Sequence, residues 1–133
     1  MESEDYRSAL VAGVVRDPLQ LPGGLFGRQR LVRIAQEQLL HVAERRPDWL
    51  LFCLLHAPLV LARPQYLGYR PHVDRRRVEF ARQVRGDPPL LLVAVKFLDA
   101  QDEAWVSTAH PMDMKYLTRR LRAGTMHEVR RGL

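Results

Sequence analysis

Two histidines, a lysine, a threonine and several arginines in this sequence have side chains that suit work on a negatively charged substrate. His41 lies one helical turn from both Glu37 and Arg45 if residues 28–45 form a helix. The unperturbed pKa of histidine is about 6.5, so this side chain can donate or accept a proton near neutral pH. The alternative is a histidine at the edge of a helix that is packed or solvated and has no chemical role.

A second group of such residues lies in residues 89–111, which read PLLLVAVKFLDAQDEAWVSTAHP. Lys96 interrupts an apolar run, so its ammonium group must reach water, a partner or a phosphate. Thr108 and His110 are two residues apart and would share one face of a strand. Thr108 suits a hydrogen bond to a phosphate oxygen, and His110 suits a second proton transfer. The alternative for Lys96 is a side chain that extends outward past apolar surface to reach water. The alternative for Thr108 and His110 is that they are ordinary strand residues with no chemical role.

The positive charge of the chain is confined to one region and consists almost entirely of arginine. Residues 1–40 carry five basic and five acidic residues, whereas residues 41–133 carry 16 and 10 and so hold the whole net charge of +6. The planar guanidinium group grips phosphate and stacks on bases. We therefore expect a polyanionic partner, with Arg45, Arg46 and Arg77 as phosphate- or RNA-binding candidates. An arginine bias on a solvated surface is the alternative.

The composition is that of an ordinary globular domain. The chain has 133 residues, of which 47% are hydrophobic and 27% charged. No apolar run approaches the roughly 18–20 residues of a membrane span, and the acidic start MESEDYRS is unlike a secretory signal. The histidines and the single cysteine, Cys53, lack metal-ligand spacing, so we expect no metal, no cofactor and no membrane partner. Cys53 lies in an apolar run and is a poor candidate for a nucleophile.

The order of the expected elements predicts an α+β fold. Helices at about 28–45 and 48–56 should pack on a four-stranded antiparallel meander. The four strands are expected at 59–63, 75–84, 90–97 and 104–110, the last two forming a hairpin. We expect residues 1–27 to be a leader and linker, 28–112 the domain, and 113–133 a basic tail or short helix that Gly124 caps.

Three short motifs in this order resemble a known family. They are HVAERRPD at 41–48, VK at 95–96 and VSTA at 106–109, with the second helix ending before Pro58. Residues 30–112 resemble the phage-associated nucleases grouped with barnase, EndoU, colicin E5/D and RelE. The resemblance implies two helices followed by a four-stranded antiparallel sheet, and metal-independent cleavage of RNA, often by toxins. The family usually has a second histidine before the proline, where this chain has Arg46, which could still bind phosphate.

Two hypotheses of function follow. In the first, the protein is a toxin-like endoribonuclease that acts in the cytoplasm on tRNA or another cellular RNA. A cognate inhibitor or immunity protein would be its protein partner. His41 would exchange protons, Lys96 and Arg45 would stabilise phosphate charge, and Thr108 would orient the phosphate, giving a 2′,3′-cyclic phosphate. In the second, it is a non-catalytic RNA- or protein-binding module of a phage or secretion assembly. The enzyme requires His41, Lys96 and Thr108 in one cleft, and the binding module does not.

Overall fold

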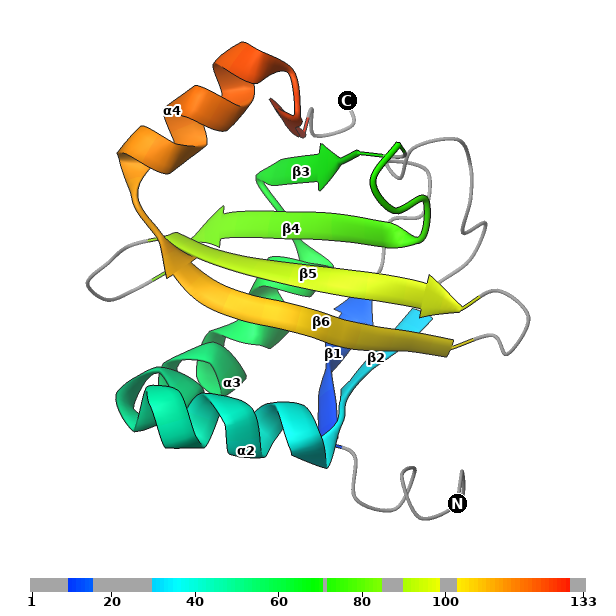
Figure 1. The fold of residues 1–133 in the computed structure, drawn as a ribbon, viewed down its shortest axis with the longest axis vertical. Helices are drawn as coiled ribbons and strands as arrows, with labels where there is room; N and C mark the ends of the chain where they lie inside the picture. Colours follow the sequence, from blue (N-terminus) through cyan, green and yellow to red (C-terminus); the bar gives the residue numbers. More distant parts are fainter. Residues whose placement is uncertain (1–9, 16–29, 71, 85–89, 99–102, 130–133) are drawn as a thin grey trace.

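A computed structural model describes residues 10–15, 30–70, 72–84, 90–98 and 103–129 (Figure 1). The elements along the chain are β1 (Leu10–Val15), β2 (Arg30–Ile34), α2 (Gln36–Arg45), α3 (Pro47–Ala62), β3 (Tyr66–Tyr69), β4 (Arg77–Gln83), β5 (Leu90–Leu98), β6 (Glu103–Met112), α4 (Met114–Ala123) and β7 (Met126–Glu128). In the described part of the chain, seven strands form one sheet in the order β1-β2-β6-β5-β4-β3-β7. Helices α2 and α3 lie on one side of this sheet and α4 lies on the other (Figure 1).

Strand β5 is the centre of the sheet. It pairs antiparallel with β4 on one edge and with β6 on the other, so the predicted hairpin of residues 90–97 and 104–110 is confirmed. Residues 90–95 have no exposed surface. Because successive side chains of a strand point to opposite faces, β5 supplies alternate residues to two separate cores.

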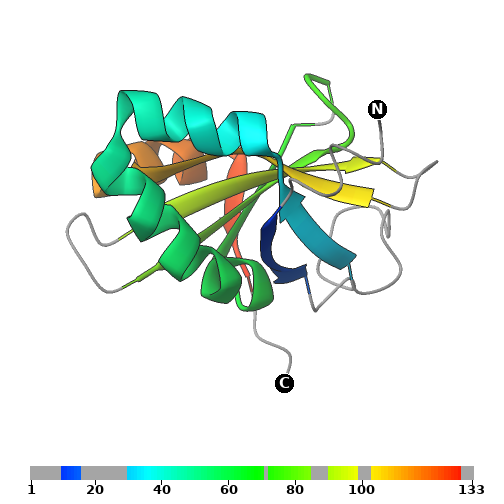
Figure 2. The ribbon, with the colours of Figure 1, turned by 90° about the horizontal axis from the view of Figure 1, so that it is seen from below.

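The larger core lies between the sheet and the layer formed by α2 and α3, which Figure 2 shows from below. Strand β5 contributes Leu91, Val93, Val95 and Phe97 to this core. Helix α3 contributes Cys53, Ala57, Val60 and Leu61. Apolar residues occur all round α3 in the sequence, but only this side of the helix is buried.

The smaller core lies between the sheet and α4. It joins Leu90, Leu92 and Ala94 of β5 to Leu117 of α4 and to Met126. The side chain of Asp113 accepts a hydrogen bond of 2.8 Å from the backbone N–H of Tyr116 and so caps the start of α4. Gly124 ends the helix in the left-handed conformation with φ of 74°, which confirms the predicted helix and its glycine cap.

The predicted fold class, two N-terminal helices on a four-stranded antiparallel meander, is wrong. The sheet is mixed, because β2 pairs parallel with β6, and the helices α2 and α3 lie between strands in the chain. Residues 30–34 were expected in the first helix but form β2. Val32 and Ile34 are buried and Leu31 is 41% exposed, so the alternation with a period of two outweighs the helical spacing.

Two further segments differ from the expectation. Residues 59–63 were predicted as a strand, but α3 continues through Pro58 to Ala62. A proline inside a helix costs about 3 kcal/mol, and the helix continues because Val60 and Leu61 of its last turn are buried in the larger core. Between the expected strands at 59–63 and 75–84 no strand was predicted, yet these residues hold β3, which pairs with β4 and β7.

A buried ion pair fastens α4 to the sheet. Glu79 of β4 and Arg120 of α4 are 4% and 6% exposed, and two guanidinium nitrogens of Arg120 donate to the two carboxylate oxygens of Glu79. Arg120 also donates to the hydroxyls of Tyr116 and Thr125. A Cβ at Gly68 would lie 2.5 Å from the carboxylate of Glu79, so only glycine fits beside the pair.

We predict that Glu79→Gln lowers the free energy of unfolding by roughly 2–4 kcal/mol at about pH 7, because it leaves the buried guanidinium without its counter-charge. Burial raises the pKa of Glu79, but Arg120, Arg77 and Arg70 outweigh it and hold this pKa below its ordinary value. The stabilisation is therefore present above the ordinary pKa of about 4.3 and is lost as the pH falls through the lower folded pKa.

Chemical denaturation at a series of pH values measures this effect. The difference between wild type and Glu79→Gln should shrink below about pH 4, as Glu79 in the wild type takes up a proton. Glu44→Gln, at an exposed glutamate of α2, is the control and should change stability little at any pH. A difference for Glu79→Gln that is independent of pH would contradict this role of the pair.

Candidate functional site

The structure separates the residues that sequence analysis placed in one catalytic cleft. His41 lies on α2, whose side of the sheet holds the larger core. Lys96 lies between Val95 and Phe97, which both point into that core, so its side chain points to the opposite face. The sheet therefore stands between His41 and Lys96.

His41 and Thr108 do lie together. Both line a small pocket of about 60 Å³ between α2, α3 and β6, which Gln38, Cys53 and Val106 also line. The side-chain amide of Gln38 donates a hydrogen bond of 2.6 Å to the backbone carbonyl of Ser107 and holds α2 to β6. Ser107 has no register partner on β5, because the pairing shifts between Ala94 and Val95. The pocket is large enough for a small polar group and too small for a nucleotide.

The arginines near His41 lie at the turn between α2 and α3. Arg45 and Arg46 are both exposed. The guanidinium carbon of Arg46 lies 4.1 Å from the centre of the Trp49 ring, as in a cation–π contact. These two candidates belong with His41, on the side of the sheet away from Lys96.

Lys96 belongs to a row of side chains that runs across four neighbouring strands. In the strand register, Arg33 of β2 is paired with Trp105 of β6, Trp105 with Lys96 of β5, and Lys96 with Arg77 of β4. Residues paired in this way point to the same face, which here is the face that also carries α4. We call these four residues the cationic row. At a strand spacing of about 4.8 Å, the row spans roughly 14 Å.

The cationic row lies outside the smaller core, which α4 covers. The apolar contacts of α4 on the sheet include Leu90, Leu92 and Ala94, toward the start of β5, whereas Lys96 lies near the end of that strand. In Figure 1, α4 accordingly lies at the end of the sheet away from the arrowhead of β5. The Lys96 side chain is 49% exposed and that of Arg77 is 28% exposed.

Three carboxylates of the described chain border the cationic row. One of them, Glu103, accepts a hydrogen bond of 3.3 Å from the indole N–H of Trp105, and the other two pair with cations of the row. Asp74 lies 3.5 Å from the ammonium of Lys96, and Glu79 lies 3.5 Å from the guanidinium of Arg77. The backbone N–H of Arg76 and then the charge of Lys96 hold the pKa of Asp74 below its ordinary value. Asp74 and Glu79 are therefore both charged at neutral pH and orient the cations beside them.

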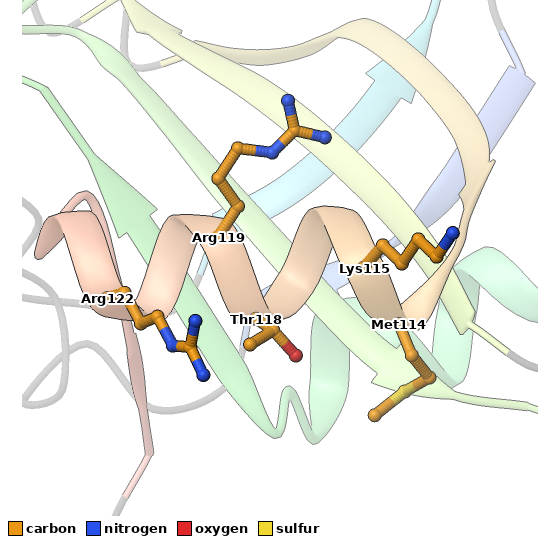
Figure 3. A pocket seen from close by; sticks show the side chains of 5 residues that line it. All are labelled: Met114, Lys115, Thr118, Arg119 and Arg122. Atoms are coloured by element: carbon orange, nitrogen blue, oxygen red, sulfur yellow. The ribbon is translucent and has the colours of Figure 1, made fainter.

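A second cationic surface lies on the outer side of α4. A shallow hollow of about 440 Å³ is lined by Met114, Lys115, Thr118, Arg119 and Arg122 (Figure 3). In that view Lys115 and Arg119 extend from one side of the helix and Arg122 from the other. Among the described residues, neither Lys115 nor Arg122 has a carboxylate partner.

The remaining candidate residue, His110, lies on β6. His110 is opposite Leu92 in the register, and its Nδ1 lies 3.0 Å from the carbonyl oxygen of Pro111.

Within the described residues no group of three or more His, Cys, Asp or Glu is placed to hold a metal ion. No helix in the same part of the chain is long and apolar enough to cross a membrane.

Sequence analysis missed Arg33 and Trp105 as members of a site. Arg33 was placed in a helix, where it could not be paired with the hairpin. The alternation of apolar and basic residues at Val32, Arg33 and Ile34 was the sequence signal that could have placed it in a strand. Trp105 was expected only as a residue of the strand at 104–110, because its neighbours across the sheet depend on pairings between distant segments.

Comparisons with protein-family models, with curated proteins and with solved structures found no match for this chain. The resemblance to the phage-associated nucleases therefore rests on the quoted motifs alone.

The thiol of Cys53 lines the pocket of His41 and gives a test of that pocket. Burial raises the pKa of this thiol to about 11, which disfavours the reactive thiolate. We predict that iodoacetamide alkylates Cys53 at about pH 8 at least ~100-fold more slowly in the folded chain than in the chain unfolded in guanidinium. Mass spectrometry over time measures the rate, and equal rates would show that the fold does not protect the thiol, in contradiction to its burial.

Proposed function

We propose that the protein binds RNA through the side of the sheet that carries α4 and the cationic row. The observation that carries this proposal is the unequal charge of the two sides. Helix α4 has four basic residues and no acidic residue, and three of the four face outward while Arg120 is paired with the buried Glu79; residues 36–63, which form the opposite helical layer, have three arginines and three acids. A polyanion is thus drawn to one side of the molecule and not to the other.

The buried Glu79–Arg120 pair fixes α4 on the sheet, and this places the other cations of α4 where they can bind RNA. Arg120 is turned inward and bound to Glu79, so α4 is fixed on the sheet by one of its own arginines. Lys115, Arg119 and Arg122 then face outward around the shallow hollow. Side chains held by a rigid helix lose less conformational freedom when they bind phosphate than the same side chains in a loop.

The cationic row adds contacts of a different kind on the same side. Lys96 and Arg77 are placed to bind phosphate oxygens, and Trp105 between Arg33 and Lys96 offers an aromatic surface beside them. Cationic grooves with interspersed aromatic rings are typical of proteins that bind single strands. A strand that crosses the row would meet a cation on three of the four sheet strands beneath it.

A second candidate function is the endoribonuclease expected from the family resemblance. The observation in its favour is the shared pocket of His41 and Thr108, with Arg45 exposed on the same helix. It ranks second because Lys96, the predicted phosphate-binding cation, points to the opposite face. An enzyme built on this pocket would depend on Arg45 and Arg46 in place of Lys96 to stabilise the phosphate.

We predict that RNA affinity falls with salt and that this dependence maps to the α4 side. Each phosphate contact with a single strand adds about 0.7 to the slope of log K against log salt. Arg119→Gln and Lys96→Gln should each weaken binding and lower the slope by about that amount. Arg45→Gln, an exposed arginine on the neutral side, is the matched control and should bind like wild type.

Fluorescence anisotropy with a labelled single-stranded RNA across a salt series gives both quantities. Loss of binding in Arg45→Gln with none in Arg119→Gln or Lys96→Gln would move the interface to the helical layer. Affinity that does not change with salt would exclude binding through phosphates on either side.

The nuclease candidate has its own test, the sizing of RNA incubated with the purified protein. If the His41 pocket is catalytic, His41→Ala should slow cleavage by about 10²–10⁴-fold, the usual worth of general acid–base catalysis. His72→Ala, at an exposed histidine before β4, should cleave like wild type. EDTA should not inhibit, and products should end in a 2′,3′-cyclic phosphate. Equal rates for wild type and His41→Ala would leave only the binding function.

A further inference from the structure

The outer face of α3 is apolar and exposed. Leu51, Leu55 and Leu59 follow one another at intervals of four residues and are 71%, 68% and 43% exposed. Residues four apart lie one above the other on a helix, so the three side chains form one continuous stripe. A contiguous apolar patch of this kind on a folded protein marks a surface that is covered by a partner.

Charge is found only at the two ends of this stripe. Between Asp48 in the first turn of α3 and Arg63 just after its last turn, the sequence has no Asp, Glu, Lys or Arg. Both Asp48 and Arg63 are exposed. The stripe therefore has an acidic residue at one end, where Arg46 lies over the neighbouring Trp49, an uncharged middle and a basic residue at the other end.

We propose that the stripe is the interface of a homodimer in which α3 packs antiparallel against α3 of a second copy. A twofold axis through Leu55 places Leu51 of each copy against Leu59 of the other. It also brings Asp48 beside Arg63 of the second copy, on both sides of the axis. An interface of this type must be complementary to itself, and α3 meets that condition in its apolar spacing and in its charges.

The direction of the pairing follows from the same charges. A parallel arrangement would put Asp48 against Asp48 and Arg63 against Arg63, with the two helix dipoles aligned. The antiparallel arrangement pairs opposite charges and opposes the dipoles, and both effects favour it. Helix α4 lies on the far side of the sheet from α3, so this dimer leaves both cationic surfaces exposed.

Sedimentation velocity of the full chain over a range of concentrations tests the proposal. Wild type should be dimeric at micromolar concentration, and Leu55→Asp should raise the dissociation constant at least about 100-fold, because two carboxylates would meet on the axis. Leu121→Asp, at an exposed leucine of α4, is the matched control and should dimerise like wild type. Circular dichroism melting shows whether each variant is folded.

Charge reversal tests the antiparallel register. Asp48→Arg and Arg63→Asp should each weaken the dimer roughly tenfold, and the double variant should restore it, because each reversal acts at two symmetric pairs. A wild type that stays monomeric at all concentrations would overturn the proposal, and the stripe would then be left to another partner. A dimer unaffected by Leu55→Asp, or one that the double variant does not restore, would also overturn it.

Discussion

The burial of β5 on both faces is the constraint on which the rest of the structure depends. Six successive residues of this strand, 90–95, have no contact with solvent. A strand of this kind is stable only if strands lie on both of its edges and apolar layers cover both of its faces. The α2–α3 layer and α4 meet the second requirement from opposite sides, so the fold has to place helices on both sides of the sheet even though α4 is only ten residues long.

The Glu79–Arg120 pair shows how so short a helix is held in place. The apolar contact of α4 with the sheet centres on Leu117 and is small. The ion pair adds a directional contact between β4 and α4, and Gly68 leaves the space for it. Because Arg120 satisfies the buried carboxylate, the remaining basic residues of α4 stay at the surface. The same interaction therefore stabilises the smaller core and determines which side chains form the cationic surface.

The sequence predicted the local features well and the arrangement of distant segments poorly. The hairpin of β5 and β6 and the helix α4 with its cap at Gly124 follow from patterns within single segments or between segments that are adjacent in the chain. Strand β2 was missed because Leu31, Ile34 and Ala35 also satisfy a helical spacing, and only pairing with β1 and β6 decides between the two. Lys96 was rightly singled out as the polar residue of an apolar strand, but which face it occupies depends on that strand's position in the sheet.

The two sides of the sheet have different surface chemistry, and this limits how they can act together. A dimer formed through α3 would put the two α4 helices at its far ends, because α3 and α4 lie on opposite sides of each sheet. The cationic side of one copy would then face away from the cationic side of the other copy. A short RNA could reach only one of them, whereas a long flexible strand or two separate strands could occupy both. Dimerisation would therefore increase affinity only for RNA long enough to pass around the dimer, and RNA length would then distinguish binding by one copy from binding by two.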